Sequence, residues 1–276
     1  RNWEHIAQAL TKNHHVYALD ARGHGESEWV SGHYQFDQFV TDIAGILKAV
    51  DLQNVVLVGH SAGGKYAFTH TANDDSRVSG LVIIDMDPDP VNPGSGNMFI
   101  RYREEGDEWP DIQSVVERLR SREPNTDENF LHYLAEVMTN PLSDGRRVWK
   151  RDRQIVLEYE RPDAWATLAK IKVNTLIIRG ANSPLLRSDV AERMKDIIPS
   201  CSLVEIPNGG HWCLNENPDA IIITYGGMLN LAMDFSIKMK QGIDPEIIGP
   251  AILLNKSGSP KKVNNKNDMF FFSYSP

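Results

Sequence analysis

Residues 55–64 read Val-Val-Leu-Val-Gly-His-Ser-Ala-Gly-Gly, and this stretch decides the fold. Val55 to Val58 form a continuous apolar run, which is typical of a strand that is buried on both faces of a sheet. The next residues match the pattern Gly-x-Ser-x-Gly, and a helical pattern follows them. A strand, a sharp turn and a helix in this order hold the serine above the edge of a sheet. We therefore predict that Ser61 lies on a strained turn in an α/β protein.

The turn makes Ser61 a candidate nucleophile. A Cβ atom at Gly59 or Gly63 would crowd the sharp bend, so glycines are expected at both positions. We expect the backbone N–H of Ala62, at the start of the following helix, to donate a hydrogen bond to a developing oxyanion. A serine hydroxyl is a weak nucleophile at neutral pH, so a base must lie within hydrogen-bond reach.

His211 is the best candidate base among the nine histidines. The segment Asn208-Gly209-Gly210-His211 follows the last strand-like run and places the imidazole on a glycine-rich loop. Such loops at the carboxyl edge of an open α/β sheet are where sites form. A lone histidine in a loop is more often structural, and it is the serine turn that favours a chemical role for His211.

Strand-like and helical patterns alternate along the chain. Strand-like runs occur at residues 16–19, 55–58, 81–84, 175–178 and 202–206, and helical spacing occurs at residues 2–11, 36–50, 115–119, 130–138 and 190–198. This alternation predicts a doubly wound, mostly parallel α/β sheet.

About ninety residues separate the runs at 81–84 and 175–178, whereas a crossover needs about a dozen. We therefore expect residues 1–87 and 169–241 to form the core and residues 88–168 to form an inserted helical cap. The aromatic residues of the insert are expected to form mainly the cap's own core, with a few lining an acyl pocket. After residue 242 the composition shifts to Pro, Gly, Ser, Asn and Lys, so residues 242–276 are expected to be a poorly ordered tail.

Composition excludes several classes of partner. The chain has 37 acidic and 29 basic side chains and a formal net charge of −8, so its average field repels nucleic acid and anionic membranes. Its two cysteines are too few for a secreted disulfide framework, which favours a reducing, cytoplasmic location. The longest apolar stretch, residues 220–233, is too short to span a bilayer.

Three segments together resemble the α/β-hydrolase superfamily. They are Asp20-Ala21-Arg22-Gly23-His24-Gly25-Glu26-Ser27, the serine turn, and Gly210-His211 followed by Glu216-Asn217-Pro218, and the resemblance covers roughly residues 1–220. On physical grounds the glycines and Arg22 of the first segment serve the backbone, and we assign that segment no chemistry.

Within the superfamily the chain is similar to the esterase, enol-lactonase and non-haem perhydrolase-like group, because epoxide hydrolases and dehalogenases have aspartate at the position of Ser61. The resemblance implies hydrolysis of a small carboxylic ester or lactone through an acyl-enzyme. No His, Cys or carboxylate cluster has metal-ligand spacing and no phosphate-binding loop is present, so we expect neither a metal nor an organic cofactor.

The third member of a serine–histidine triad is a carboxylate that fixes the histidine tautomer. In the resembled group this acid usually lies in a segment like Arg179-Gly180-Ala181-Asn182-Ser183, after the strand that precedes the histidine strand. The next residue here is Pro184, and a proline side chain cannot accept a hydrogen bond. Either the acid lies elsewhere or the triad is incomplete.

Asp85 is the acid that we prefer, because it directly follows the strand-like run at 81–84 and some α/β-hydrolases take their acid from that strand end. Asp85 also fits a turn aspartate ahead of Pro88, as do Asp87 and Asp89. Asp189 is weaker, since Ser188-Asp189 resembles the start of a helix.

A second departure from the family concerns the centre of the sheet. The family has a strand before the first helix, ending in a His-Gly loop that supplies the other oxyanion N–H, whereas this chain starts at Arg1, as if truncated. By resemblance that strand lies between the runs at 16–19 and 55–58, so its absence would leave backbone groups unpaired. We hypothesise that an apolar segment of the tail, either 251–254 or 269–272, fills the slot.

These departures support an alternative function. Losing one oxyanion donor typically costs a factor of about 10² to 10³ in turnover. A catalytically impaired or inactive ligand-binding protein on a hydrolase fold, or a truncated product, is therefore the competing hypothesis.

Overall fold

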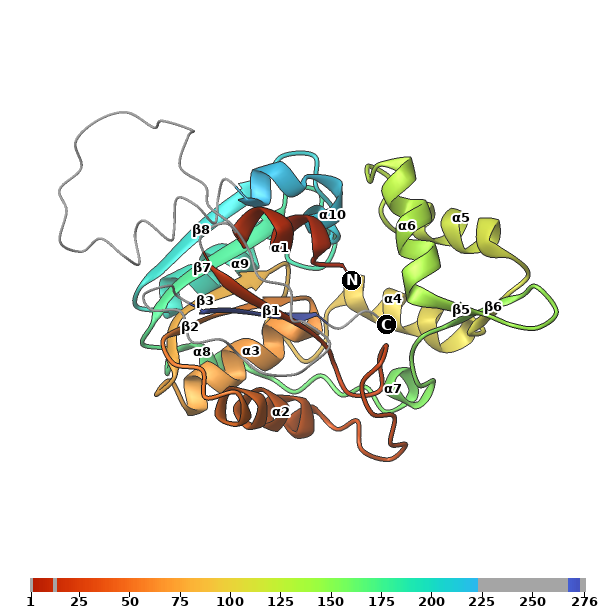
Figure 1. Ribbon diagram of the computed structural model, residues 1–276. Coiled ribbons are helices and arrows are strands. Elements are labelled where there is room, and N and C mark those ends of the chain that lie inside the picture. The colour runs from red at the N-terminus through yellow and green to blue at the C-terminus, as the bar shows by residue number, and fades with distance from the viewer. Residues whose placement is uncertain (1, 12–13, 223–267, 274–276) are drawn as a thin grey trace.

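The computed structural model describes residues 2–11, 14–222 and 268–273. Its main body is a six-stranded, fully parallel sheet with helices on both faces (Figure 1). The strands lie in the order β1 (His15–Asp20), β9 (Asp268–Ser273), β2 (Val55–His60), β3 (Val78–Ile84), β7 (Asn174–Gly180) and β8 (Cys201–Ile206). The predicted α/β class with a doubly wound parallel sheet is confirmed.

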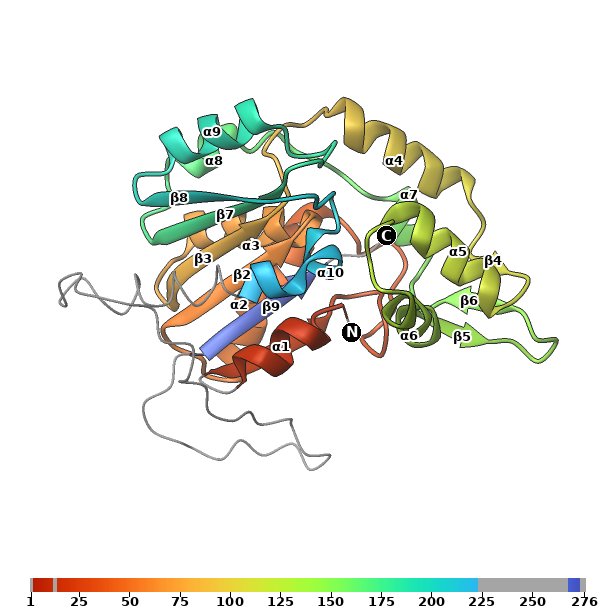
Figure 2. The same cartoon turned by 90° about the horizontal axis from the view of Figure 1, so that it is seen from above.

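Two hydrophobic layers enclose the sheet because successive strand residues point to opposite faces. Leu57 and Ile83 belong to one core cluster, whereas Val58 and Ile84 belong to the other. Figure 2 shows the helices of the two layers on opposite sides of the strands. One layer contains α2 (Phe36–Ala49), α3 (Ala62–Asn73), α8 (Trp165–Leu168) and α9 (Ser188–Ile197), and the other contains α1 (Glu4–Leu10) and α10 (Cys213–Glu216).

Strand β9 comes from the far end of the chain and fills the centre of the sheet. It pairs in parallel with β1 on one side and with β2 on the other, so that Phe271 lies opposite both Ala18 and Val58. Met269 and Phe271 face the layer of α1, where the Phe271 ring lies 4.8 Å from the Trp3 ring, and Phe270 faces the other layer. All three side chains are fully buried.

This arrangement confirms the hypothesis that residues 269–272 fill the missing slot. The alternative segment, residues 251–254, lies outside the described residues. The expectation that residues 242–276 form a poorly ordered tail is wrong for β9. The backbone of this strand pairs with β1 and β2, and its apolar side chains pack into the hydrophobic cores on both faces of the sheet.

The inserted segment lies beyond the carboxyl ends of the strands (Figures 1 and 2). It contains α4 (Pro93–Glu104), β4 (Glu108–Trp109), α5 (Ile112–Arg122), α6 (Glu128–Met138), β5 (Thr139–Pro141), β6 (Arg147–Trp149) and α7 (Gln154–Leu157). Its own core forms between α5 and α6, with Trp109, Tyr133 and Trp149 packed against it.

The expectation of an inserted helical cap over residues 88–168 needs two corrections. Strands β4, β6 and β5 form a small antiparallel sheet, and they are only two or three residues long, which is too short to show a periodic pattern. Helix α8, inside the expected cap, belongs to the main body because Leu168 is buried in the core beside α3.

In the described part of the chain, no helix combines the length and the apolar character that crossing a membrane requires. Of the apolar stretch 220–233, only residues 220–222 are described.

The burial of β9 predicts a large loss of stability in Phe271→Ala. Removing a buried phenylalanine side chain typically lowers the free energy of unfolding by about 3–5 kcal/mol. Urea unfolding followed by fluorescence measures this change, and Val91→Ala is the control because Val91 is 81% exposed. Equal stabilities for the two variants would contradict the placement of β9 in the core.

Candidate active site

Ser61 lies at the junction between β2 and α3, on a backbone that few residues adopt. Its φ of 55° and ψ of −133° are unfavourable for a residue with a side chain, a strain of about 1–3 kcal/mol. The Ser61 N–H donates to the carbonyl of Ile84 over 3.0 Å, which ties the turn to β3. A Cβ atom on Gly59 would lie 2.4 Å from the carbonyl oxygen of Gly63, so the bend requires glycine at position 59.

The structure brings Ser61, His211 and Asp85 into one chain of hydrogen-bonding groups. His211 Nε2 lies 3.0 Å from Ser61 Oγ, and His211 Nδ1 lies 3.0 Å from Asp85 Oδ1. All three side chains are buried, with Asp85 fully inaccessible. A base within reach of a serine and a carboxylate within reach of the base are what nucleophilic catalysis requires.

Asp85 is held by groups from the neighbouring strand β7. Its Oδ2 accepts the N–H of Gly180 over 2.8 Å, and the Ser183 hydroxyl donates to its Oδ1. The loop in which the family's acid was expected therefore supplies two hydrogen-bond donors instead. Because β3 and β7 are adjacent and parallel, their carboxyl ends meet at one edge of the sheet, and a carboxylate from either strand reaches the histidine.

The sequence analysis missed His60, which fixes the loop that holds His211. His60 Nε2 donates to the backbone carbonyl of His211 over 2.8 Å, and its ring packs 5.0 Å from that of Trp212. Complete burial holds the pKa of His60 well below its ordinary value, so the ring is neutral. In the sequence, the only sign of a role for His60 is its position between Gly59 and Ser61.

Three other residues that the sequence singled out, Ala62, Asp189 and Arg22, have the following surroundings. Ala62 is the first residue of α3, so its N–H has no partner within that helix. Asp189 is exposed and paired with Arg187, away from this site. Arg22 forms a two-pronged ion pair with Asp42, as expected for a structural role.

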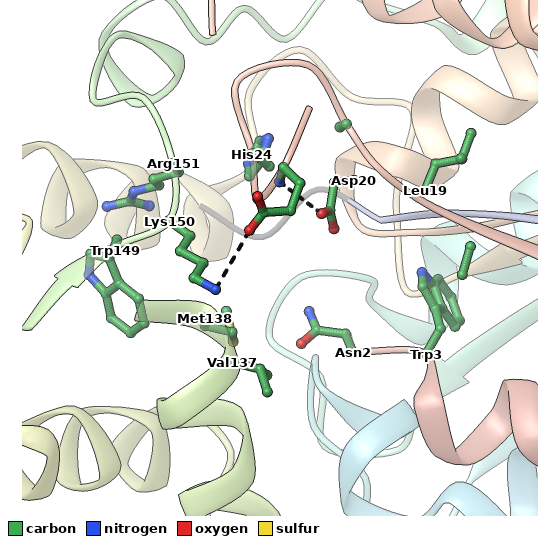
Figure 3. A pocket seen from close by; sticks show the side chains of 14 residues that line it. Asn2, Trp3, Leu19, Asp20, His24, Val137, Met138, Trp149, Lys150 and Arg151 are labelled. Carbon is green, nitrogen blue, oxygen red and sulfur yellow. Dashed lines mark hydrogen bonds and ion pairs between the residues drawn. The ribbon is translucent and has the colours of Figure 1, made fainter. Parts of the chain in front are cut away.

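Two cavities lie near the cap. One of 470 Å³ borders His211 and Pro184 and is closed on the other side by residues of α4 and α5. A smaller cavity of 120 Å³ lies between the end of β1 and the inserted segment, where Lys150 forms an ion pair with Glu26. Figure 3 shows Asp20, Trp149 and Lys150 among the side chains that line it. Of these two cavities, only the larger is lined by His211, which makes it the candidate substrate pocket.

A buried charge cluster joins α3 to both ends of the cap. Lys65 Nζ donates to the carbonyls of Pro88 and Asp89, each over 3.1 Å, and Arg161 forms an ion pair with buried Asp87. Asp87 and Asp89 therefore have structural partners and are not needed to explain the histidine. Burial, with the nearby Arg161 charge, lowers the pKa of Lys65 to about 7.

Comparison with known proteins identifies a family with the same fold. The model of the alpha/beta hydrolase fold family matches residues 1–218, and the chain belongs to this family. It is accordingly an enzyme, a hydrolase of the esterase and lipase type.

Individual relatives are distant. A Haemophilus influenzae protein with the provisional name esterase/lipase is 26% identical, over 82% of this chain and 77% of its own length. The 2-(acetamidomethylene)succinate hydrolase of Mesorhizobium japonicum is 24% identical, over 79% of each chain. The crystal structure of E-2-(acetamidomethylene)succinate hydrolase superposes with a TM-score of 0.71 at 23% identity, covering 76% of this chain and 80% of that one, which shows the shared fold.

The lowered pKa of Lys65 predicts that stability depends on pH. Between about pH 7 and its ordinary value of 10.5 the unfolded chain binds a proton that the folded protein does not, so the free energy of unfolding rises with pH. Relative to Lys65→Met, the wild type is expected to gain about 1 kcal/mol per pH unit above pH 7. In that variant the carbonyls of Pro88 and Asp89 keep the donors Ala164 N and Arg161 Nε.

Urea unfolding of both proteins at pH 6, 7.5 and 9 tests this dependence. Lys48→Met, which removes an exposed lysine of α2, is expected to leave the slope unchanged. Parallel curves for the wild type and Lys65→Met would show that Lys65 titrates normally.

Proposed function

We propose that this hydrolase cleaves a small carboxylic ester or lactone through an acyl-enzyme on Ser61. The observation that supports the proposal is the buried chain from Ser61 through His211 to Asp85, with both contacts at 3.0 Å. Each group has the partner that its chemical role needs. The adjoining cavity of 470 Å³ lies within the range of small-molecule sites.

In the proposed mechanism, Ser61 Oγ attacks the carbonyl carbon while His211 Nε2 accepts the hydroxyl proton. The N–H of Ala62 donates to the negative carbonyl oxygen of the tetrahedral intermediate. His211 then returns the proton to the leaving alkoxide, which leaves an ester on Ser61. A water molecule, deprotonated by His211, attacks this ester and releases the acid.

Asp85 keeps His211 in the tautomer that this mechanism needs. Its carboxylate accepts from Gly180 N–H and from the Ser183 hydroxyl, and these bonds fix its orientation. The Asp85 Oδ1 atom lies 3.0 Å from Nδ1 and accepts a hydrogen bond from the proton on that nitrogen. The lone pair of Nε2 then faces Ser61, and the positive charge that forms on the ring is balanced.

The wider setting of the enzyme belongs to the same proposal. We propose that the segment from α4 to α7 is a cap domain that covers the substrate pocket. We also propose that the enzyme accepts lactones as well as open-chain esters. Cys201 and Cys213 are both free thiols, in keeping with a cytoplasmic enzyme.

Labelling with a fluorophosphonate tests whether Ser61 is an activated nucleophile. The wild type is expected to be labelled, while Ser61→Ala and His211→Ala should show no labelling above background because one lacks the nucleophile and the other lacks the base. Mass spectrometry locates the label, and circular dichroism confirms that the variants are folded. A folded wild type that resists labelling would favour a non-catalytic ligand binder.

The role of Asp85 predicts a large and specific loss of turnover in Asp85→Asn. An asparagine amide favours the wrong histidine tautomer, and in a serine protease the same change costs about 10⁴ in turnover. We expect kcat for 4-nitrophenyl acetate to fall about 10³- to 10⁴-fold. Asp189→Asn, on the exposed start of α9, is the matched control. Similar rates for the two variants would remove Asp85 from the mechanism.

A further inference from the structure

The cavity beside His211 has an unusual charge for this chain. The whole protein has a formal net charge of −8, yet the part of the cavity wall formed by α4 and α5 includes Arg101, Arg118 and Arg122. The cap and the histidine loop also meet there, since the Asn125 side chain donates to the carbonyl of Asn208 over 3.0 Å. His211 belongs to the same cavity wall, and its Nε2 lies 3.0 Å from Ser61 Oγ.

Arg101 and Arg118 share a single carboxylate. Glu105 binds Arg101 Nε through one oxygen over 2.7 Å and Arg118 Nε through the other over 2.8 Å. Two positive charges thus face one negative charge, which leaves one positive charge in excess. The Arg118 side chain is only 8% exposed, so this excess lies where water screens it poorly.

Arg118 keeps donors available toward the cavity. Within the described residues its Nε makes the ion pair with Glu105, and its guanidinium lies 5.4 Å from the centre of the Tyr102 ring. Those residues include no hydrogen-bond partner for its two terminal nitrogens. A guanidinium edge of this kind binds a carboxylate through two parallel hydrogen bonds.

Two other charged residues of the cavity wall lie on the side of the histidine loop. Arg122 pairs with buried Glu123 and stacks 3.7 Å from the centre of the Trp212 ring, which fixes the histidine loop. Glu216 also lines the cavity, but its carboxylate accepts the N–H of Gly210, and burial raises its pKa. Within the described residues, neither Glu123 nor Glu216 forms an ion pair with Arg118, whose carboxylate partner is Glu105.

We propose that the preferred substrates of this site are esters with a second, free carboxylate, which binds Arg118 while the ester carbonyl lies at Ser61. This inference rests on the proposed function and narrows it from esters in general to short monoesters of dicarboxylic acids or esters of similar charge. The shared Glu105 holds the Arg118 guanidinium in place, and Tyr102 supports its face.

A pair of esters that differ only in charge provides the test. Mono-4-nitrophenyl adipate has a free carboxylate, and its methyl ester is the neutral analogue of similar shape. We expect kcat/KM of the wild type to be at least about tenfold higher for the anionic ester, because one charge-assisted, two-pronged contact is lost with the neutral one. Added salt should reduce this preference by raising KM for the anionic ester.

Two variants test whether the preference for the anionic ester arises at Arg118, because one removes a positive charge from the cavity wall and the other removes a negative charge. Arg118→Gln should lower kcat/KM for the anionic ester about tenfold or more and leave the neutral ester within about twofold. Glu105→Gln should raise kcat/KM for the anionic ester by lowering its KM, so it tests the charge argument even if Arg118→Gln fails to fold. Arg120→Gln is the control on the same helix, since Arg120 pairs with Glu128 at the surface.

The outcomes separate this inference from the proposed function. Ser61-dependent cleavage of both esters at equal rates, or equal losses for both esters in Arg118→Gln, would overturn the inference and leave the serine hydrolase intact. If the wild type cleaves neither ester, the proposed function and the preference among esters both fail, and calorimetric titration with adipate then tests the carboxylate site at Arg118 by itself. Adipate binding that Arg118→Gln abolishes supports the carboxylate site, and no binding to the wild type overturns it.

Discussion

The pairing of β9 between β1 and β2 is the constraint on which the rest of the structure depends. The inward edges of β1 and β2 each present a row of backbone donors and acceptors, and both rows lie between two apolar layers where no water satisfies them. Residues 268–273 satisfy both rows at once. The position of β2 relative to β1, and with it the position of the serine turn, therefore depends on the far end of the chain.

The site above this sheet is organised around one carboxylate rather than around the serine. Asp85 accepts hydrogen bonds from Gly180 at the end of β7, from Ser183 in the loop that follows, and from His211 in the histidine loop. Its own N–H donates to the carbonyl of Ile178, so the backbone and the side chain both tie the end of β3 to β7. A buried carboxylate with this many hydrogen-bond partners is held in one orientation and fixes the ring that faces Ser61.

The parts of the fold that the sequence predicted are those with a local periodic signal. The run at 55–58 is apolar throughout and the run at 175–178 is apolar after Thr175, and both are strands. The spacing of Phe36, Phe39 and Ile43 matches the buried face of α2. The strands of the cap are too short to have a period.

In the candidate site, too, some residues have a local sequence signal, whereas others are defined by contacts with residues far along the chain. Ser61 and His211 stand in recognisable loops, whereas the choice of Asp85 over Asp87 or Asp89 depends on contacts with residues about a hundred positions away. No spacing within the segment 85–89 contains that information. His60 was missed for the same reason, since its partner is a backbone carbonyl 151 residues further along the chain.

Net charge illustrates a related limit. An excess of acidic side chains describes the average field far from the surface, and it sets an expectation for large polyanions such as nucleic acid. A small ligand inside a cavity responds instead to the few charges within about one screening length, of the order of 10 Å. At Glu105 two arginines share one carboxylate, so an acidic protein still offers a single carboxylate a favourable position beside Arg118. Selectivity at this site is therefore decided by the local pairing of charges in α4 and α5, which the composition of the whole chain does not reveal.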